Sequence, residues 1–222
     1  MFTGIIEAVG KLASIEARGG DMRLCVDSGA LDLGDVKLGD SIATNGVCLT
    51  VTGLTGSGYW ADVSQETLAC STLSELDVGT RLNLEKAMLP TGRFGGHMVS
   101  GHVDGIGQVT GIRDEGRSMR YRIEPPAELA RYIANKGSIT VDGVSLTVNG
   151  LEANSFELNI VPHTAQQTIV SQYREGSRVN LEVDLVARYL ERLLQGSEEQ
   201  GPMSNMTQDF LAQHGFTGRG RR

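Results

Sequence analysis

The stretch SIATNGVCLTV at residues 41–51 occurs twice in this chain, because its second copy, SITVDGVSLTV, occupies residues 138–148. The two copies are offset by 138 − 41 = 97 positions, and the same offset aligns residues 1–4 with residues 98–101 without a gap. A repeat of this length exceeds the period of solenoid and propeller proteins, so each copy can enclose a core of its own. The repeat therefore predicts two similar domains in tandem.

Each copy has the pattern of a small β-barrel. Short runs of alternating apolar and polar residues are separated by glycine turns, and Asn45-Gly46 and Asp142-Gly143 suit two-residue hairpins. Residues 1–15 fit one bent strand or a strand pair, and residues 30–36 fit a short helix. Many short strands with few helical turns predict a mainly β protein with a closed or Greek-key barrel in each copy.

The domain boundaries follow from the repeat and from a change of period near its end. The first barrel is expected over residues 1–92 and the second over residues 93–184. From Leu185 the apolar residues adopt helical spacing, which predicts an amphipathic helix over residues 185–195. Its apolar stripe can cover either another subunit or its own domain. Residues 196–222 are polar and are expected to form a flexible tail.

The composition excludes several classes of function. Apolar residues make up 40% and charged residues 21%, which is normal for a soluble globular protein. The net charge of −7 argues against broad nucleic-acid binding, and no apolar run is long enough to span a membrane. The three cysteines show neither disulfide nor metal-ligand spacing, which predicts a reduced, cytoplasmic protein without structural metal.

The two copies differ at positions that carry reactive side chains. The aligned pairs, first copy before second, are Ile5 and His102, Gly39 and Lys136, Asn45 and Asp142, Cys48 and Ser145, and Ala87 and Asp184. Histidine and carboxylates can transfer protons near neutral pH, and a thiolate is a strong nucleophile. This asymmetry indicates two similar binding sites with different catalytic groups.

Each of these residues also fits a structural role. Cys48 can be a small buried hydrophobe, and His102 a hydrogen-bonded structural residue. Asp142 can serve only its turn, and Lys136 can be a solvated charge. On spacing alone, the chain is a duplicated ligand-binding barrel.

Four segments carry a resemblance to a known family. They are MFTGIIE at 1–7, NGVCLTV at 45–51, GGHMVSGH at 95–102 and DGVSLTV at 142–148. Over about residues 1–190 the chain resembles riboflavin synthase of the alpha-chain type. The resemblance implies two six-stranded Greek-key barrels and a homotrimer held largely by the C-terminal helices.

The resemblance also implies a transferase reaction. Two molecules of 6,7-dimethyl-8-ribityllumazine exchange a four-carbon unit, which gives riboflavin and 5-amino-6-ribitylaminouracil without a metal or organic cofactor. One lumazine donates the unit and the other accepts it, which gives a duplicated barrel its use. In the family the two sites face each other between the N-terminal domain of one subunit and the C-terminal domain of a neighbour.

Site residues follow where this sequence matches the family's motifs. The substrate site of the first copy is expected to contain Gly4, Ile5, Ile6, Cys48, Leu49, Thr50, Asp62, Val63, Ser64, Gln65, Glu66 and Thr67. That of the second copy is expected to contain Gly101, His102, Val103, Lys136, Ser145, Leu146, Thr147, Asn159, Ile160, Val161, Pro162, His163 and Thr164. Backbone amides of residues 48–50 and 145–147 are expected to pair with the pteridine edge.

The expected chemistry is removal of a proton from the C7 methyl group of one lumazine and addition of a nucleophile at C7 of the other. The candidates for these roles are Ser41, Cys48, His102 and Asp184, while Thr50, Lys136 and Thr147 are expected to position substrate. Holding two activated substrates together can also supply much of the rate.

Two rival functions remain at this point. One is a carrier that binds lumazine or flavin on the same fold without turnover, although carriers lose polar residues of the second site that this chain keeps. The other is an inert scaffold, which would leave the differences between the copies without a purpose. The sequence leaves open which site holds the donor and whether the trimer associates with lumazine synthase.

Overall fold

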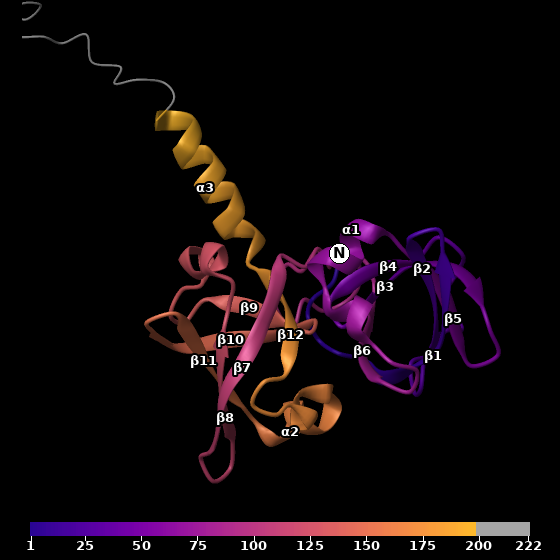
Figure 1. Ribbon diagram of the computed structural model, residues 1–222, viewed down its shortest axis with the longest axis horizontal. Coiled ribbons are helices and arrows are strands. Elements are labelled where there is room, and N and C mark those ends of the chain that lie inside the picture. Colours follow the sequence, from indigo (N-terminus) through magenta and orange to yellow (C-terminus); the bar gives the residue numbers. More distant parts are fainter. Residues whose placement is uncertain (199–222) are drawn as a thin grey trace, which may run out of the picture. The chain divides into compact units, whose positions relative to one another are not determined.

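The first half of the chain folds into a closed antiparallel barrel. The computed structural model describes residues 1–198, with side chains as far as residue 195. The barrel consists of β1 (Ala8–Arg18), β2 (Asp21–Asp27), β3 (Ser41–Thr44), β4 (Val47–Leu54), β5 (Gly58–Val63) and β6 (Arg81–Lys86) (Figure 1). Its spatial order is β1-β2-β5-β4-β3-β6. Successive hairpins join β3, β4 and β5, and β2 lies beside β5, which is the Greek-key arrangement.

The second half repeats this barrel. It consists of β7 (Gly105–Asp114), β8 (Met119–Glu124), β9 (Ser138–Val141), β10 (Val144–Glu152), β11 (Ser155–Ile160) and β12 (Arg178–Val183), in the order β10-β11-β8-β7-β12-β9. Register shifts after Leu12 and Val51 recur after Val109 and Val148, 97 positions later. Such bulges bend strands and help a small sheet to close. The expected mainly β fold with two Greek-key barrels is confirmed.

Each barrel encloses its own core, as the length of the repeat predicted. Alternate residues of the strands point inward, and large members of the first core include Leu12, Ile42 and Tyr59. Ile139 and Phe156 are members of the second core. The buried Tyr59 hydroxyl and the Thr44 hydroxyl lie 2.6 Å apart, so the polar end of this ring is hydrogen-bonded.

Short helical segments connect some of the strands. They are α1 (Gln65–Cys70) and the 3₁₀ helix η1 (Thr72–Glu75) in the first half, and η2 (Ala127–Tyr132), α2 (Pro162–Gln167) and η3 (Ile169–Gln172) in the second. The prediction of a helix at residues 30–36 was wrong, because these residues form turns and irregular backbone. The Asp32 carboxylate accepts a hydrogen bond from the Gly34 amide at 2.8 Å, a local turn that competes with helix formation. The strand expected at residues 1–15 begins only at Ala8.

The two barrels contact each other through equivalent residues. The side-chain amide of Asn83 donates to the Asp142 carbonyl at 2.9 Å, and that of Asn180 donates to the Asn45 carbonyl at 2.9 Å. A Cβ atom added to Gly46 would stand 2.6 Å from the Gly143 nitrogen. The β3–β4 and β9–β10 turns therefore meet about a local twofold axis, and the buried asparagines link them.

The chain divides into two compact units after Leu185, and the second unit begins with the C-terminal helix. Helix α3 covers Leu185–Glu198, so residues 196–198 continue the helix that was expected to end at 195. The expected flexible tail lies, from residue 199 on, outside the described residues. Val186, Tyr189, Leu190, Leu193 and Leu194 of α3 are exposed.

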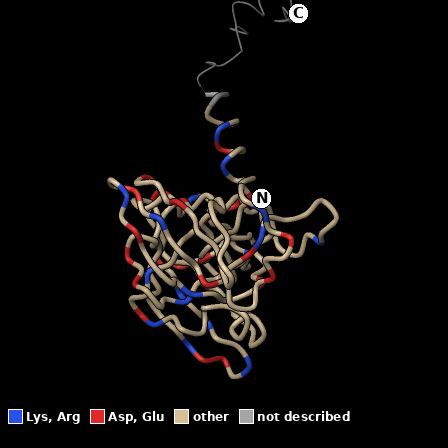
Figure 2. Tube along the Cα trace, turned by 90° about the vertical axis from the view of Figure 1, so that its right-hand side faces the viewer, with Lys and Arg blue, Asp and Glu red and all other residues tan. Residues whose placement is uncertain are grey.

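The surface carries charges of both signs. Lysine and arginine are interspersed with aspartate and glutamate along the trace (Figure 2). Close pairs include Arg120 with Glu115, whose nearest charged atoms lie 2.6 Å apart, and Lys86 with Asp35, also at 2.6 Å. Among the residues that the structure describes, no helix has the length and apolar character needed to cross a membrane.

Candidate functional site

The first residues of each half cross to the barrel of the other half. Phe2 and Val99 pair as an antiparallel bridge, with amide-to-carbonyl distances of 2.8 and 3.2 Å. Beyond the bridge, the Gly101 carbonyl accepts a hydrogen bond from the Cys48 amide at 2.8 Å. The Gly4 carbonyl likewise accepts one from the Ser145 amide at 2.7 Å. Each barrel is thus completed by a segment from the other half.

This exchange corrects the grouping expected from sequence. Gly4, Ile5 and Ile6 were assigned to the site of Cys48, but Gly4 pairs with Ser145 and Ile6 packs against the second core. Conversely, Val103 packs against the first core. We therefore define two sites by the residues that meet there. The Cys48 site consists of Cys48, the residues that contact it in the first barrel, and residues 101–103. The Ser145 site consists of Ser145, the residues that contact it, and residues 4–6.

The exchange also occupies two of the amides that were expected to face the pteridine. The amides of Cys48 and Ser145 donate to the crossing carbonyls, so that expectation was wrong for these two residues. Glycine permits the close approach. A Cβ atom on Gly101 would stand 2.6 Å from the Cys48 Cβ, and one on Gly4 would stand 2.6 Å from the Ser145 Cβ. Both glycines also have positive φ, at +79° and +76°.

The Cys48 site contains a cavity of about 260 Å³. It is lined by Val47, Cys48, Glu66, Thr67, Cys70, Ser71, Gly101, His102 and Val103. The Cys48 side chain projects outward from β4, α1 supplies Glu66 and Thr67, and the crossing segment supplies His102. The structure thus brings together a thiol, a carboxylate, a hydroxyl and an imidazole from both halves of the chain. Small-molecule pockets commonly combine polar groups of this kind with apolar walls.

Other residues expected in the first site lie around α1 or inside the barrel. The Ser64 hydroxyl accepts from the Thr67 amide at 3.3 Å and caps α1, while Asp62 lies 3.6 Å from Arg23. Thr50 and Gln65 are exposed. Leu49 and Val63 belong to the core, so only their backbone atoms are available to a ligand.

The Ser145 site contains a histidine that sequence reasoning missed. His97 Nδ1 lies 2.7 Å from the Ser145 hydroxyl oxygen. His97 is nine-tenths buried, and its Nε2 atom has no hydrogen-bond partner. Burial lowers the pKa of His97, against an opposing effect of the Asp184 carboxylate, which favours a neutral imidazole. The signal was available, because His97 stands inside the motif at residues 95–102.

Most residues expected in the second site lie on the outer surface of its barrel. Lys136, Thr147, Asn159, Val161, Pro162 and His163 are exposed, and Leu146 and Thr164 are half-buried. Ile160 belongs to the core. The Lys136 backbone has a left-handed φ of 65°, and its amide donates to the Val148 carbonyl at 2.8 Å. Lys136 is thereby held beside β10, on which Ser145 and Thr147 lie.

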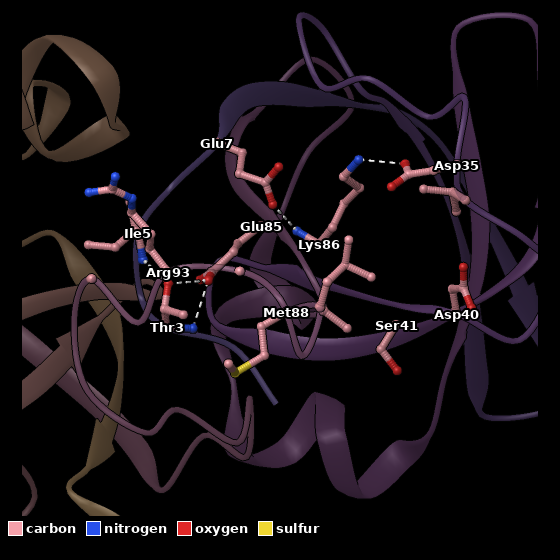
Figure 3. Close-up of a pocket in the computed structure, with 15 residues that line it drawn as sticks. Thr3, Ile5, Glu7, Asp35, Asp40, Ser41, Glu85, Lys86, Met88 and Arg93 are labelled. Carbon is pink, nitrogen blue, oxygen red and sulfur yellow. Dashed lines mark hydrogen bonds and ion pairs between the residues drawn. The ribbon is translucent and has the colours of Figure 1, made fainter.

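Ser41 lines a different cavity from Cys48. This cavity, of about 790 Å³, is bounded by the linker after β6, and Figure 3 shows Ser41, Glu7, Lys86 and Arg93 around it. Lys86 is paired with Asp35 there. Of the four candidates for catalysis, Cys48 and His102 line the same cavity, whereas Ser41 lines this larger one. Asp184 acts electrostatically on His97 instead.

Comparison with known proteins shows the same duplication of a domain. The family model of the lumazine binding domain matches residues 3–87 and again residues 100–184. A riboflavin synthase of Photobacterium phosphoreum is 51% identical, and one of Bacillus subtilis is 43% identical, each over 97% of this chain and at least 99% of the relative. One of Mycobacterium tuberculosis is 47% identical over 89% of this chain and its own full length.

Solved structures show the same fold. LumP in complex with 6,7-dimethyl-8-(1'-D-ribityl) lumazine superposes with a TM-score of 0.75 at 26% identity. LumP in complex with riboflavin superposes with a TM-score of 0.77 at 25% identity. Each comparison covers 82% of this chain and 99% of LumP.

Proposed function

The chain belongs to the riboflavin synthase family, and we propose that it converts two molecules of 6,7-dimethyl-8-ribityllumazine into riboflavin and 5-amino-6-ribitylaminouracil. In this reaction it acts as a transferase, because a four-carbon unit passes from one lumazine to the other. The observation that carries the proposal is the pair of equivalent sites in one chain, each with polar side chains of its own. A reaction between two identical substrates needs two such sites.

We propose that proton transfer and nucleophilic addition fall to residues among the four catalytic candidates. Cys48 and His102 share one cavity, which supports a joint role at the Cys48 site. One of them, or a bound water, adds at C7 of one lumazine, while a base removes a proton from the C7 methyl group of the other. Ser41 and Asp184 remain candidates for these steps. Thr50, Lys136 and Thr147, all exposed beside the sites, position the substrates.

The proposed assembly is a homotrimer. The exposed apolar residues of α3 support it, because a stripe of this kind gains free energy when a partner covers it. In such an assembly the Cys48 site of one subunit faces the Ser145 site of a neighbour. A cytoplasmic location is also proposed, since the three cysteines are unpaired, as in proteins of reducing compartments. Association with lumazine synthase stays an open prediction.

A carrier of lumazine or flavin is the alternative function. LumP shares the fold and is solved with such ligands, but its identity to this chain is 26%, against 51% for a riboflavin synthase. The chain also retains Ser145, Thr147 and Lys136 at the second site. Both observations favour the enzyme.

One assay separates the two functions. The purified chain is incubated with 6,7-dimethyl-8-ribityllumazine, and the products are resolved by liquid chromatography. The enzyme yields riboflavin at half the molar loss of lumazine over many turnovers. Tight binding without product would instead establish the carrier.

A further inference from the structure

Two buried glutamates hold the crossing segments. Glu85 on β6 and Glu182 on β12 occupy equivalent positions of the repeat and are 4% and 5% exposed. Glu85 accepts hydrogen bonds from the Thr3 amide and the Thr3 hydroxyl, both at 2.7 Å (Figure 3). It also accepts one from the Gly4 amide at 2.9 Å. Glu182 accepts from the Ser100 amide at 2.7 Å and from the Gly101 amide at 2.9 Å. Each glutamate thus clamps two successive backbone amides, and the amide distances, 2.7 and 2.9 Å, are the same in both clamps.

Each clamp acts on the opposite barrel. Glu85 belongs to the first barrel, but the Gly4 residue that it holds pairs with Ser145 of the second barrel. Glu182 belongs to the second barrel, but the Gly101 residue that it holds pairs with Cys48 of the first. In both cases the amide of one glycine binds the glutamate, and the carbonyl of the same glycine binds the opposite site.

We propose that Glu85 and Glu182 are cross-positioning residues: Glu85 sets the geometry of the Ser145 site, and Glu182 sets that of the Cys48 site. The use of these sites for lumazine rests on the proposed function, whereas the positioning itself does not. Through Glu182 the second barrel fixes the segment that carries His102 against Cys48.

When it is ionised, a carboxylate suits this role because its two oxygens only accept hydrogen bonds, and two successive backbone amides point at them. Glutamine has the same size, but its NH₂ group would face one of the amides donor to donor. Substitution with glutamine therefore breaks one bond of the clamp and leaves the packing intact. Burial raises the pKa of Glu85, and it raises that of Glu182 to about 7 against the opposing backbone amides of Ser100, Gly101 and His102.

The reactivity of a thiol can test the proposal without any assay of lumazine. Cys48 is half-buried under Gly101 and serves as the reporter of its own site, in a C25S/C70S background. E182Q is expected to speed alkylation of Cys48 by iodoacetamide about tenfold, the effect of losing one charge-assisted hydrogen bond. E85Q is the matched control and is expected to leave that rate unchanged.

The mirror experiment uses the repeat. Adding C48S and S145C moves the reporter thiol to the second site, and there E85Q is expected to speed alkylation while E182Q has no effect. The proposal is overturned if each glutamine variant exposes the thiol of its own barrel, if both expose the same thiol, or if neither changes a rate. If a glutamine variant does not fold, E85D and E182D make the same comparison, because they retract the carboxylate without removing an acceptor.

Enzyme kinetics then separate this inference from the proposed function. If the chain is the enzyme, both glutamine variants lower kcat/KM for lumazine, while their elution volume stays that of the parent and their Tm falls by only about 3–6 °C. If the chain proves to be a carrier, the crossed pattern of thiol rates is still expected. Lower activity with unchanged thiol rates would contradict cross-positioning.

Discussion

At the scale of single residues, Cys48 and Ser145 occupy the same position of the repeat but have different neighbours. Ser145 is hydrogen-bonded to His97 at 2.7 Å, whereas Cys48 shares a cavity with His102. Depending on its tautomer, a neutral His97 imidazole either accepts a hydrogen bond from the Ser145 hydroxyl at Nδ1 or donates one to the Ser145 hydroxyl oxygen. His97 thus determines whether the Ser145 hydroxyl is left to donate or to accept in any further hydrogen bond.

This contact predicts the effect of replacing His97. H97F removes the partner of the Ser145 hydroxyl and is expected to lower kcat/KM about tenfold, the effect of one lost hydrogen bond in a partly buried site. H97N places a polar atom near the position of Nδ1 and is expected to retain more activity than H97F. Steady-state kinetics with lumazine measure both variants. Equal activity of H97F and the parent would exclude this role.

Asp142 makes the stability of the fold depend on pH. Its carboxylate is buried, accepts from the Tyr173 hydroxyl at 2.6 Å and from the Asn180 amide at 2.8 Å, and burial raises its pKa from 3.8 to about 7. The folded state therefore binds more protons than the unfolded state between these two values. The contribution of Asp142 to stability is present at low pH and is lost as pH rises through this window.

We therefore expect D142N to flatten the pH dependence of stability. Asparagine occupies the same position in the first copy, as Asn45. The Asn45 side-chain oxygen accepts a hydrogen bond from the Asn83 backbone amide at 2.7 Å. Between about pH 5 and about pH 8, the unfolding free energy of the parent should fall by up to about 1.4 kcal/mol per pH unit more than that of D142N. The Tm of the parent should therefore fall more steeply over this range. Glu182, whose pKa is also raised, contributes equally to both proteins. Parallel Tm curves would contradict the assignment.

At the scale of elements, local sequence predicted the hairpins well and the crossing segments poorly. Asn45-Gly46 and Asp142-Gly143 mark their turns because both positions of each turn have positive φ. The crossing of residues 1–4 and 98–101 depends on contacts with glutamates more than 80 positions away, which no local pattern records. The helix expected at 30–36 failed for the opposite reason, since a purely local Asp32 turn replaced it.

The contact between the β3–β4 and β9–β10 turns predicts how a single methyl group acts there. G46A would drive a Cβ atom into the Gly143 backbone and is expected to lower the unfolding free energy by about 1–3 kcal/mol beyond the strain of its positive φ. G39A is the control, because Gly39 has a similar φ of +92° but nothing within 4 Å of its Cβ position. Urea unfolding compares them, and equal losses would mean that the turns do not hold the barrels together.

At the scale of the whole molecule, the repeat predicted the two barrels but not how they complete each other. The family motifs brought Cys48, Glu66, Thr67 and His102 into the expected site set, and the structure places all four around one cavity. The assignment of residues 4–6 was wrong because a linear alignment keeps each half separate. A segment exchanged between halves is visible only in three dimensions.

The proposed trimer makes a prediction at the same scale. L193D places a charge in the exposed apolar stripe of α3 and is expected to convert trimers into monomers. R192A, on another face of the helix, is expected to leave the trimer intact. Sedimentation velocity distinguishes these states, and a parent chain that sediments as a monomer would contradict the proposal.

Isotope mixing shows whether one enzyme joins two lumazine molecules. The chain is given an equimolar mixture of unlabelled 6,7-dimethyl-8-ribityllumazine and lumazine ¹³C-labelled in its four-carbon unit. Riboflavin receives one such unit from each substrate molecule, so mass spectrometry should find riboflavin with one labelled unit as the most abundant product, and 5-amino-6-ribitylaminouracil without label. If riboflavin forms only with both units or neither unit labelled, or does not form at all, the chain does not join two lumazine molecules.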